Sequence, residues 1–560
     1  MNSRKRNDPG SGHVFVWLFF LLLAILAGVI VAPRLVKAAH KPFIAGIEPA
    51  VGEPGAAIRI AGKNFGSERG GASVEFDGVA PTASSYLSWA DDLIELRVPL
   101  YTETSMVRVH TELGLSNPRM FMSIARLPVR PVGASASSVA PVVDSLSVDQ
   151  APVGSVLVLR GLNFGANRDK SMVQFSWQSA AAAFSGMDDD SSRGIVSPSE
   201  DDGEYLSWSD KEIKILVPDG AVSGAVAVRT DRGVSTARYF QVTDAPGSKS
   251  YTEKRTYALN SFVAISRVQG AAPNGLHLWI PYPDSSASQR GVKNLGRSAE
   301  PLVPEYKGLS VYRLPDMAPD KLVTVSQDHL VQVYAVETDI KADRVKLPPK
   351  PLPPLYPLYT AADNLVPADA PEIKAFAAKT AGREKNPYRL ARLAYDALLA
   401  AVEIDPAARS ESPVAALAAK RADAWDMSLL YVAMLRSLEI PARPVAGVIV
   451  DDSRKAWNHA WAEFYLYGLG WIPVDLALGA GAEIGSFKAP FEDRERYFGN
   501  LDARHIAFSR GLVRVAALSP EGRSLSAARR YSMQTIFEEA TGALSSYTSF
   551  WSDVEITGIY

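Results

Sequence analysis

The sequence contains no cysteine among its 560 residues. Disulfide bonds, thiolate metal sites and thiol catalysis are therefore excluded, and a cysteine-free chain is compatible with export into an oxidising compartment. Histidine is scarce as well: the chain has seven, with no His-x-x-x-His motif and no carboxylate cluster at metal-binding spacing. The sequence predicts no metal and no cofactor.

The chain also has little net charge. Its 59 Lys and Arg residues against 61 Asp and Glu residues give a formal charge of −2. Nothing in this balance attracts nucleic acid, so we expect no nucleic-acid partner. The chain is too long for one hydrophobic core, and its apolar content of 47% is ordinary for folded proteins. Three or four folded domains are expected.

A basic segment precedes a long apolar run at the N-terminus. Residues 4–6 are Arg-Lys-Arg, and Val14 to Ala32 form an apolar run of about 19 residues, enough to cross a hydrocarbon core. Small residues at 36–38 would allow cleavage as a signal peptide instead. We expect residues 1–40 to be an inner-membrane anchor or a signal peptide, with the rest of the chain in the periplasm or outside.

An internal repeat dominates the first half of the chain. IRIAGKNFGSERGGASVEF from Ile58 matches LVLRGLNFGANRDKSMVQF from Leu157, and YLSWADDLIELRVP from Tyr86 matches YLSWSDKEIKILVP from Tyr205. Short alternating segments between Gly, Pro and Asn clusters are typical of an antiparallel sandwich. The second copy carries an acidic, Ser-rich insertion around 187–204, which predicts a mobile loop.

Both copies resemble the IPT/TIG family of immunoglobulin-like domains. They share a Gly-x-Asn-Phe-Gly turn, a late Val-Pro and a closing Gly-x-Ser, which start at Gly62 and Gly161, Val98 and Val217, and Gly114 and Gly233. The resemblance implies two all-β sandwiches, residues 42–126 and 140–243, that bind or space without chemistry of their own. The Pro-, Ser- and Ala-rich residues between them predict a linker.

A third β-rich region and a helical region follow. Two-residue alternation predicts strands through 248–346, and dense proline predicts an extended polyproline II strut over 347–370. Asn386 is expected to cap one helix, and a second helix should begin near Asp423 and end before Pro441. Strands are then expected at Pro444–Val450, Trp461–Leu466 and Trp471–Val474.

Three motifs in this region together resemble the transglutaminase-like fold, a papain-related α+β core. They are LEIPAR at 438–443, HAW from His459 and GWIPVD ending at Asp475. In that family a cysteine at a helix N-terminus is the nucleophile, a His is the base and an Asp orients it. The resemblance implies that 371–511 form this core, with 248–346 as its N-terminal part, and gives His459 and Asp475 the base and orienting positions.

The nucleophile of that family is missing. Its Gly-x-Cys-x-Asp pattern falls on residues 422–426, which puts Ala424 at the cysteine position. An alanine methyl cannot attack a carbonyl. Ser428 lies one helical turn further on, several ångströms from a position where small displacements already cost heavily. Covalent thiol chemistry is therefore excluded.

The remaining candidates each have two interpretations. His459 and Asp475 either bind a ligand in the old cleft or are a retained, hydrogen-bonded structural pair. Trp425, Trp461 and Trp471 either pack in the core or line a ligand-binding cleft. We interpret His505 as structural. In the C-terminal extension, 512–560, a basic run predicts a solvated face and residues 534–543 predict a helix.

These features predict a non-catalytic binding or scaffold protein of the cell envelope, whose ligand is a peptide, peptidoglycan or another protein. The alternative is an exported hydrolase or acyltransferase with a non-cysteine mechanism around His459 and Asp475. A third interpretation is a passive spacer whose core binds nothing.

Overall fold

The computed structural model describes residues 41–52, 55–76, 79–99, 105–123, 140–177, 194–243, 246–319, 321–519, 522–525 and 529–560. The predicted membrane anchor and most of the predicted linker lie outside these ranges. Among the residues that are described, no helix has the length and hydrophobicity needed to cross a bilayer. The chain divides into two compact units, residues 1–134 and 135–560.

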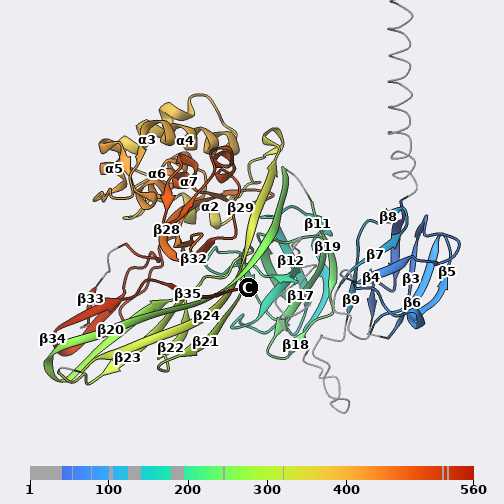
Figure 1. Ribbon diagram of the computed structural model, residues 1–560, viewed down its shortest axis with the longest axis horizontal. Helices are drawn as coiled ribbons and strands as arrows, with labels where there is room; N and C mark the ends of the chain where they lie inside the picture. The colour runs from blue at the N-terminus through green and yellow to red at the C-terminus, as the bar shows by residue number, and fades with distance from the viewer. Residues whose placement is uncertain are drawn as a thin grey trace, which may run out of the picture. The chain divides into compact units, whose positions relative to one another are not determined.

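The first unit is the predicted two-sheet sandwich (Figure 1). Side chains that alternate between buried and exposed along its strands close a core around Ile60, Phe65 and Phe121. One sheet contains β1 (Phe43–Glu48), β3 (Ala57–Lys63), β6 (Leu93–Arg97) and β5 (Tyr86–Trp89), and the other contains β2 (Val51–Gly52), β9 (Arg119–Ser123), β7 (Ser105–Thr111), β4 (Ser73–Phe76) and β8 (Gly114–Leu115), with a 3-10 turn at Ala83–Ser85.

The second copy repeats this strand order. One sheet contains β10 (Val142–Leu146), β12 (Val156–Leu162), β16 (Glu212–Leu216) and β15 (Tyr205–Trp208). The other contains β11 (Gln150–Ala151), β19 (Arg238–Val242), β17 (Gly224–Thr230), β13 (Met172–Ser176), β14 (Ile195–Val196) and β18 (Gly233–Val234). The repeated sequences build the same turn twice. Asn64 and Asn163 adopt φ of 63° and 64°. In the first copy the Trp89 indole donates to the Phe65 carbonyl, and in the second copy the Trp208 indole donates to the Phe164 carbonyl.

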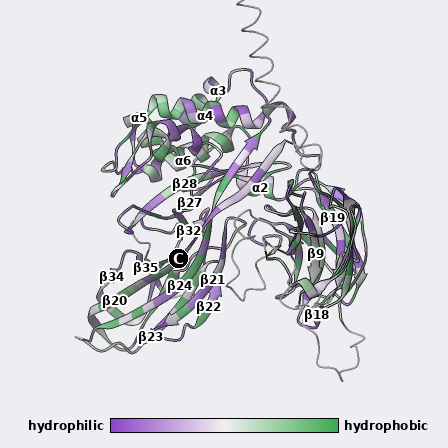
Figure 2. Cartoon of the chain, turned by 45° about the vertical axis from the view of Figure 1, so that its right-hand side comes forward, coloured by the Kyte–Doolittle hydropathy of each residue, from purple (hydrophilic) through white to green (hydrophobic). Residues whose placement is uncertain are grey.

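Long strands dominate the third β region. Green and purple bands alternate along them, as expected for strands with one buried face (Figure 2). The sheet contains β20 (Gly247–Pro281), β21 (Gln289–Arg297), β22 (Val303–Tyr306), β23 (Leu309–Pro315), β24 (Val323–Ile340), β33 (Arg523–Leu525), β34 (Glu538–Trp551) and β35 (Glu555–Ile559). The C-terminal extension is therefore part of this sheet.

The predicted helix at 534–543 is wrong. Residues 538–551 form β34, which pairs antiparallel with both halves of β20. The helix-forming run Phe537-Glu538-Glu539-Ala540 is overridden because residues 263–278 of β20 offer backbone groups that pair with it and with the residues after it. The two glutamates are buried in the strand: Glu538 accepts from the Trp551 indole at 2.6 Å, and Glu539 accepts from the backbone of Leu518 and Ser519.

The core packs helices on a four-stranded sheet in the order β29-β28-β27-β32. The predicted strands are confirmed as β27 (Ala442–Val450), β28 (Ala456–Leu466) and β29 (Gly470–Val474), and β32 (His505–Arg510) completes the sheet. The helices are α3 (Pro371–Ala381), α4 (Pro387–Ala401), α5 (Pro413–Ala419), α6 (Ala424–Ser437) and α7 (Leu476–Ala480), with short elements at β25 (Glu403–Ile404), β26 (Arg421–Ala422), β30 (Glu483–Ile484), β31 (Phe487–Lys488), η4 (Ala342–Arg344) and η5 (Phe491–Tyr497).

Helix α6 is the centre of this core. It packs on β27 and β28 on one side and on α3, α4 and α5 on the other, so every residue from Asp426 to Arg436 is buried. A helix enclosed on all sides needs polar residues only at its ends, which matches its sequence. The neighbouring helix α4 begins as predicted, with the Asn386 side chain accepting from the backbone of Tyr388 and Arg389.

The Pro-rich segment 347–370 contains a helix that its composition did not predict. Residues 355–360 form the short helix α2. Leu355, Tyr356 and Tyr359 on this helix pack against Tyr465 and Trp471 in a separate apolar cluster. The polyproline prediction is wrong here because three large apolar side chains gain more by burial than an extended, solvated backbone would allow.

The acidic insertion of the second copy also differs from its prediction. Residues 178–193 lie outside the described ranges, but 194–204 are described and are not a solvated loop. Asp202 and Glu204 are both buried. The Glu204 carboxylate accepts from the backbone N–H of Ser199 at 2.6 Å, and Asp202 pairs with an arginine of the core. Composition alone did not reveal these partners.

Candidate functional site

The start of α6 is the position that the sequence assigns to the missing nucleophile. Asp423 is the N-cap and accepts from the backbone N–H of Asp426 at 2.8 Å, so Ala424 is the first residue of the helix. Ala424 is half-buried. The Ser428 hydroxyl donates to the Ala424 carbonyl at 2.7 Å and is buried, which leaves it no role as a substitute nucleophile.

An arginine from the C-terminal extension lies at this helix start. The Arg529 guanidinium contacts Asp426 at 2.5 Å and Asp423 at 3.2 Å, and donates to the Ser410 carbonyl at 2.9 Å. It also lies 6.0 Å from the Trp425 ring centroid. The prediction of a solvated basic face is therefore wrong for Arg529, which instead neutralises two carboxylates at the end of a helix.

An open cavity of about 340 Å³ lies beside this helix start. Trp425 and Leu429 of α6 line one side, and the C-terminal residues Arg529, Met533 and Phe537 contribute to the other. Polar residues of the lining include Asn364, Ser410, Glu411, Ser412 and Gln534. Apolar and polar residues contribute about equally to the lining, and an apolar surface with convergent polar groups is typical of ligand sites. Of the three predicted tryptophans, Trp425 is the one that lines this cavity.

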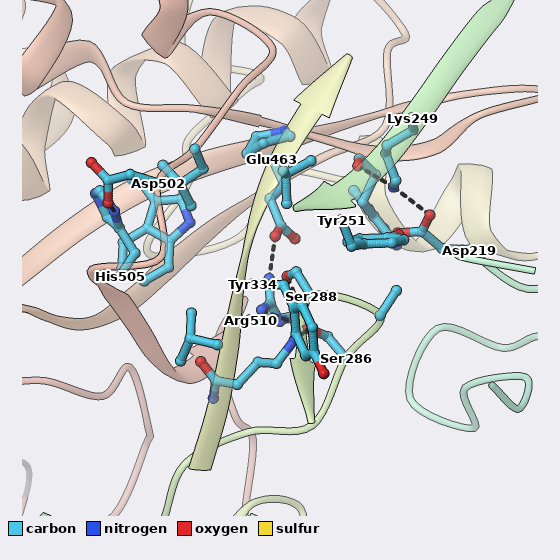
Figure 3. Close-up of a pocket in the computed structure, with 18 of the residues that line it drawn as sticks. Asp219, Lys249, Tyr251, Ser286, Ser288, Tyr334, Glu463, Asp502, His505 and Arg510 are labelled. Carbon is cyan, nitrogen blue, oxygen red and sulfur yellow. Dashed lines mark hydrogen bonds and ion pairs between the residues drawn. The ribbon is translucent and has the colours of Figure 1, made fainter. Parts of the chain in front are cut away.

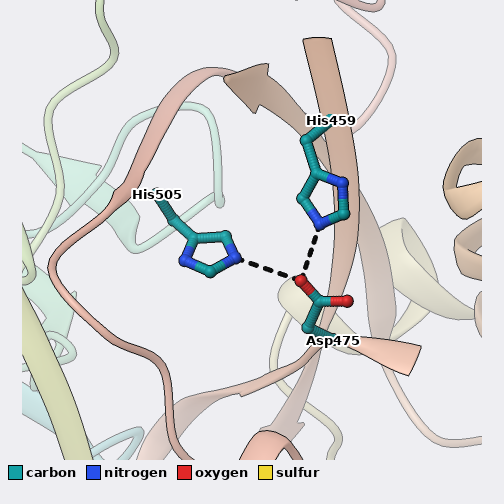
Figure 4. A group of neighbouring side chains, drawn as sticks. All are labelled: His459, Asp475 and His505. Atoms are coloured by element: carbon teal, nitrogen blue, oxygen red, sulfur yellow. Dashed lines mark hydrogen bonds and ion pairs between the residues drawn. The ribbon is translucent and has the colours of Figure 1, made fainter. Parts of the chain in front are cut away.

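His459 and Asp475 form the expected pair, and a second histidine joins them (Figure 4). His459 Nε2 lies 2.6 Å from Asp475 Oδ2, and His505 Nε2 lies 3.0 Å from the same oxygen. The exposed fractions of the three side chains are 2%, 0% and 0%. His459 stands on β28, Asp475 caps α7 after β29, and His505 begins β32. The group is enclosed within the described core.

Carboxylates on both sides fix the charge state of His505. Its Nδ1 lies 2.9 Å from Asp502 Oδ1. Burial opposes the charge, but Asp502 and Asp475 outweigh burial and raise the pKa of His505 to about 9. Burial likewise opposes ionisation of Asp475, yet His459 and His505 hold the pKa of that carboxyl well below its usual range. At neutral pH the cluster is a charged, hydrogen-bonded network.

Trp461 and Trp471 are buried, with exposed fractions of 1% and 4%. Both line a small cavity of about 30 Å³, which is large enough only for water. Figure 3 shows other residues of its lining, among them Glu463 and Arg510. The Arg443 guanidinium stacks on Trp471, 3.8 Å from its ring centroid, and the Trp471 indole donates to Asp202 at 3.2 Å. The structure thus places both of these tryptophans in packing positions.

A buried ion-pair network surrounds that small cavity. Arg443 contacts Asp202 at 2.7 Å and Glu463 at 2.8 Å, and Arg510 contacts Glu463 and Asp284. Burial opposes ionisation of Glu463, but Arg510 and Arg443 lower its pKa to about 2. Because Asp202 belongs to the second sandwich and Arg443 to the LEIPAR motif, the network joins these two parts.

Sequence reasoning missed three functional groups. His505 was noted without its link to Asp475, although the carboxylate of Asp502 three residues earlier is a local signal. Arg529 and Asp202 reach their partners from segments far away in the chain, and no spacing rule predicts such contacts. The only grouping of three metal-binding side chains found among the described residues, His459, Asp475 and His505, was likewise not predicted.

These observations define a multidomain protein with an immunoglobulin-like sandwich and a transglutaminase-like α+β core. The sequence model of the IPT/TIG domain matches residues 42–117, and that of the transglutaminase-like superfamily matches residues 374–476. The chain therefore contains an IPT/TIG domain followed by a transglutaminase-like domain.

A curated relative adds little about activity. An uncharacterized protein of Haemophilus influenzae is 26% identical over 169 residues, which cover 24% of this chain and 46% of the relative. The chain thus spans about half the length of the curated relative it matches.

Solved structures resemble the chain only loosely. A putative cysteine protease from Cytophaga hutchinsonii is 15% identical, with 56% of this chain and 92% of that chain covered and a TM-score of 0.37. A surface glycan-binding protein from Prevotella bryantii is 12% identical, with 52% and 92% covered and a TM-score of 0.14. Both scores are too low to support a functional argument.

Proposed function

We propose that this protein is a non-catalytic binding protein of the cell envelope, in which the transglutaminase-like domain has kept a cleft and lost its reaction. The observation that carries the proposal is the start of α6. Alanine stands at the nucleophile position, Arg529 pairs with the carboxylates on either side of it, and an open cavity remains next to Trp425.

The enclosed histidine pair counts against the alternative of a non-cysteine hydrolase. A general base must come within about 3 Å of the proton it removes. With exposed fractions of 2% and 0%, His459 and Asp475 offer a substrate no direct access. Their hydrogen bond instead completes a network with His505, which is a structural role.

The cavity lining suggests the chemical class of the ligand. Its apolar residues are Leu365, Pro413, Trp425, Leu429, Leu512, Met533 and Phe537. A volume of about 340 Å³ suits one or two large apolar side chains, with backbone amides held by the polar residues of the lining. Both properties fit a peptide segment, free or as part of an envelope protein or peptidoglycan stem, better than a bare sugar.

Binding to peptides tests this proposal. The purified protein would be titrated with a random-sequence peptide library and with soluble peptidoglycan fragments, beside two variants. Trp425→Ala should weaken binding at least tenfold, because a cavity-lining indole is lost. Phe491→Ala, which removes a highly exposed aromatic ring outside the cavity, should change nothing. Equal binding by wild type and Trp425→Ala would exclude the cavity as the site.

A further inference from the structure

The cluster of His459, Asp475 and His505 contains the donor atoms of a metal site. The two imidazole Nε2 atoms and a carboxylate oxygen all lie within 4.8 Å of one another. Both nitrogens point at the same oxygen, as Figure 4 shows. Two imidazoles and one carboxylate are a donor set that suits borderline divalent cations such as Zn²⁺ and Co²⁺.

The groups around the cluster hold two of the three side chains, His505 and Asp475, as metal ligands are usually held. His505 Nδ1 lies 2.9 Å from Asp502 Oδ1, and Asp502 Oδ2 accepts from the Tyr497 hydroxyl at 2.9 Å. Asp475 Oδ1 accepts from the backbone N–H of Leu478 at 2.9 Å, which leaves Oδ2 for the cluster. Such a chain of carboxylate, imidazole and ligand atom orients histidines in metal proteins.

The small cavity borders the cluster at His505, which is the one of the three ligand residues that lines it, and a water held there would be the fourth ligand. It holds about 30 Å³, enough for water, and is lined by His505, Asp502 and Trp461. The buried indole N–H of Trp461 has no hydrogen-bond partner, and its ring packs 5.1 Å from that of His505. A metal-bound water in this cavity would give that N–H an acceptor.

We propose that His459, Asp475 and His505 bind one Zn²⁺ ion that stabilises the junction of β28, β29 and β32. On binding, His505 releases its Nε2 proton to solvent, His459 binds as the neutral tautomer with its proton on Nδ1, and the two Nε2 contacts with Asp475 Oδ2 are replaced by bonds to the ion. Ligand atoms of a tetrahedral site with bonds of 2.0–2.1 Å lie about 3.3 Å apart, so the present separations of 2.6 and 3.0 Å must widen by less than about 1 Å. Because the site is enclosed, its role is structural, and it is independent of ligand binding next to Trp425.

Metal analysis of the full chain is the first test. Protein produced in zinc-supplemented medium and dialysed against a weak chelator should retain about one zinc per chain by elemental mass spectrometry. Protein produced with cobalt should show the visible absorption bands of four-coordinate Co²⁺ with nitrogen and oxygen ligands. Less than a tenth of an equivalent of metal, or cobalt protein without these bands, would overturn the proposal even if no variant could be purified.

Variants then locate the ion. His505→Asn and Asp475→Asn should each lose the bound metal and the cobalt bands, whereas His110→Asn, which changes a histidine of the first sandwich, should retain both. Retention of one equivalent and of the bands by His505→Asn and Asp475→Asn would mean an adventitious ion elsewhere on the chain. That result would equally overturn the proposal.

Discussion

Ala424 stands where a helix dipole would activate a thiol. It is the half-buried first residue of α6. Arg529 forms ion pairs with Asp423 and Asp426, which are close to Ala424 in the sequence. The positive end of the dipole lowers a thiol pKa. In Ala424→Cys the introduced thiol should therefore react with iodoacetamide at pH 7 about fivefold faster than an ordinary helical cysteine.

Ala401→Cys is the matched control for this prediction. Ala401 is equally half-buried but ends α4, where the dipole has the opposite sign. Mass spectrometry would follow the alkylation of both variants over time. If Ala424→Cys reacted only after denaturation, the helix start would be closed, and our assignment of the nucleophile position would fail.

Glu463 should make the free energy of unfolding depend on pH in the acidic range. Its pKa in the folded chain is about 2, below the unfolded value of 4.5. The ionised carboxylate therefore stabilises the fold above about pH 4.5, and this stabilisation disappears as the pH falls towards 2. From pH 5 to pH 3 we expect Glu463 alone to account for a loss of about 2 kcal/mol in the free energy of unfolding.

Denaturant unfolding of residues 140–560 at the two pH values measures this effect. Glu463→Gln should be less stable at pH 5, because Arg443 and Arg510 lose a charged partner, and its stability should fall less from pH 5 to pH 3. An identical pH dependence in wild type and variant would show that the Glu463 network does not carry this part of the acid sensitivity.

Sequence patterns correctly predicted the helices and strands whose structure depends on neighbouring residues in the chain. Asn386 caps a helix as expected, a second helix begins next to Asp423 as expected, and β27, β28 and β29 match the alternation in the sequence. The predictions failed for elements whose structure depends on contacts with residues far away in the chain. Residues 538–551 are a strand because β20 pairs with them, and 355–360 are a helix because Tyr465 and Trp471 offer an apolar surface.

The same distinction holds for the candidate site. The family resemblance predicted His459 and Asp475 as a pair, since its motifs assign both positions. It predicted neither His505 as the second partner of Asp475 nor Arg529 at the start of α6, because each arrives through tertiary folding. Burial also separated the tryptophans, leaving Trp425 at the open cavity and enclosing Trp461 and Trp471.

Asp202, at the end of the acidic insertion, should contribute to the stability of the fold. Asp202 accepts hydrogen bonds from Arg443, Tyr359 and Trp471. Asp202→Ala should lower the free energy of unfolding by about 3 kcal/mol, because three buried donors lose their acceptor. Asp201→Ala changes an exposed neighbour and should cost under about 0.5 kcal/mol. Equal effects, measured by denaturant unfolding, would exclude a specific role for Asp202.

At the scale of the whole molecule, the two sandwiches differ in their attachments. The second contacts the rest of its unit through Ser155, Asp202 and Asp219, which bind Tyr467, Arg443 and Lys249. In the repeat alignment the first copy has Ala56, Ala83 and Leu100 at these positions. It lacks the polar anchors, consistent with the division of the chain into units 1–134 and 135–560.

This difference predicts independent folding of the first sandwich. A fragment of residues 41–123 should unfold cooperatively on its own, since its core lies within those residues. Its removal should leave the unfolding midpoint of 140–560 unchanged within about 1 °C. A fragment of residues 140–243 should instead be destabilised, because its anchors lose their partners. Calorimetry of the three fragments measures these midpoints. A fragment 41–123 that does not unfold cooperatively, or a fragment 140–243 that is as stable as it is within 140–560, would contradict the prediction.

The central claim is that the transglutaminase-like core binds without catalysing. The most direct measurement is turnover of amine-donor, peptide and ester substrates by the purified protein beside His459→Ala. We predict that neither protein exceeds the rate in buffer. Turnover by the wild type that disappears in His459→Ala would contradict the claim and establish an enzyme with a non-cysteine mechanism.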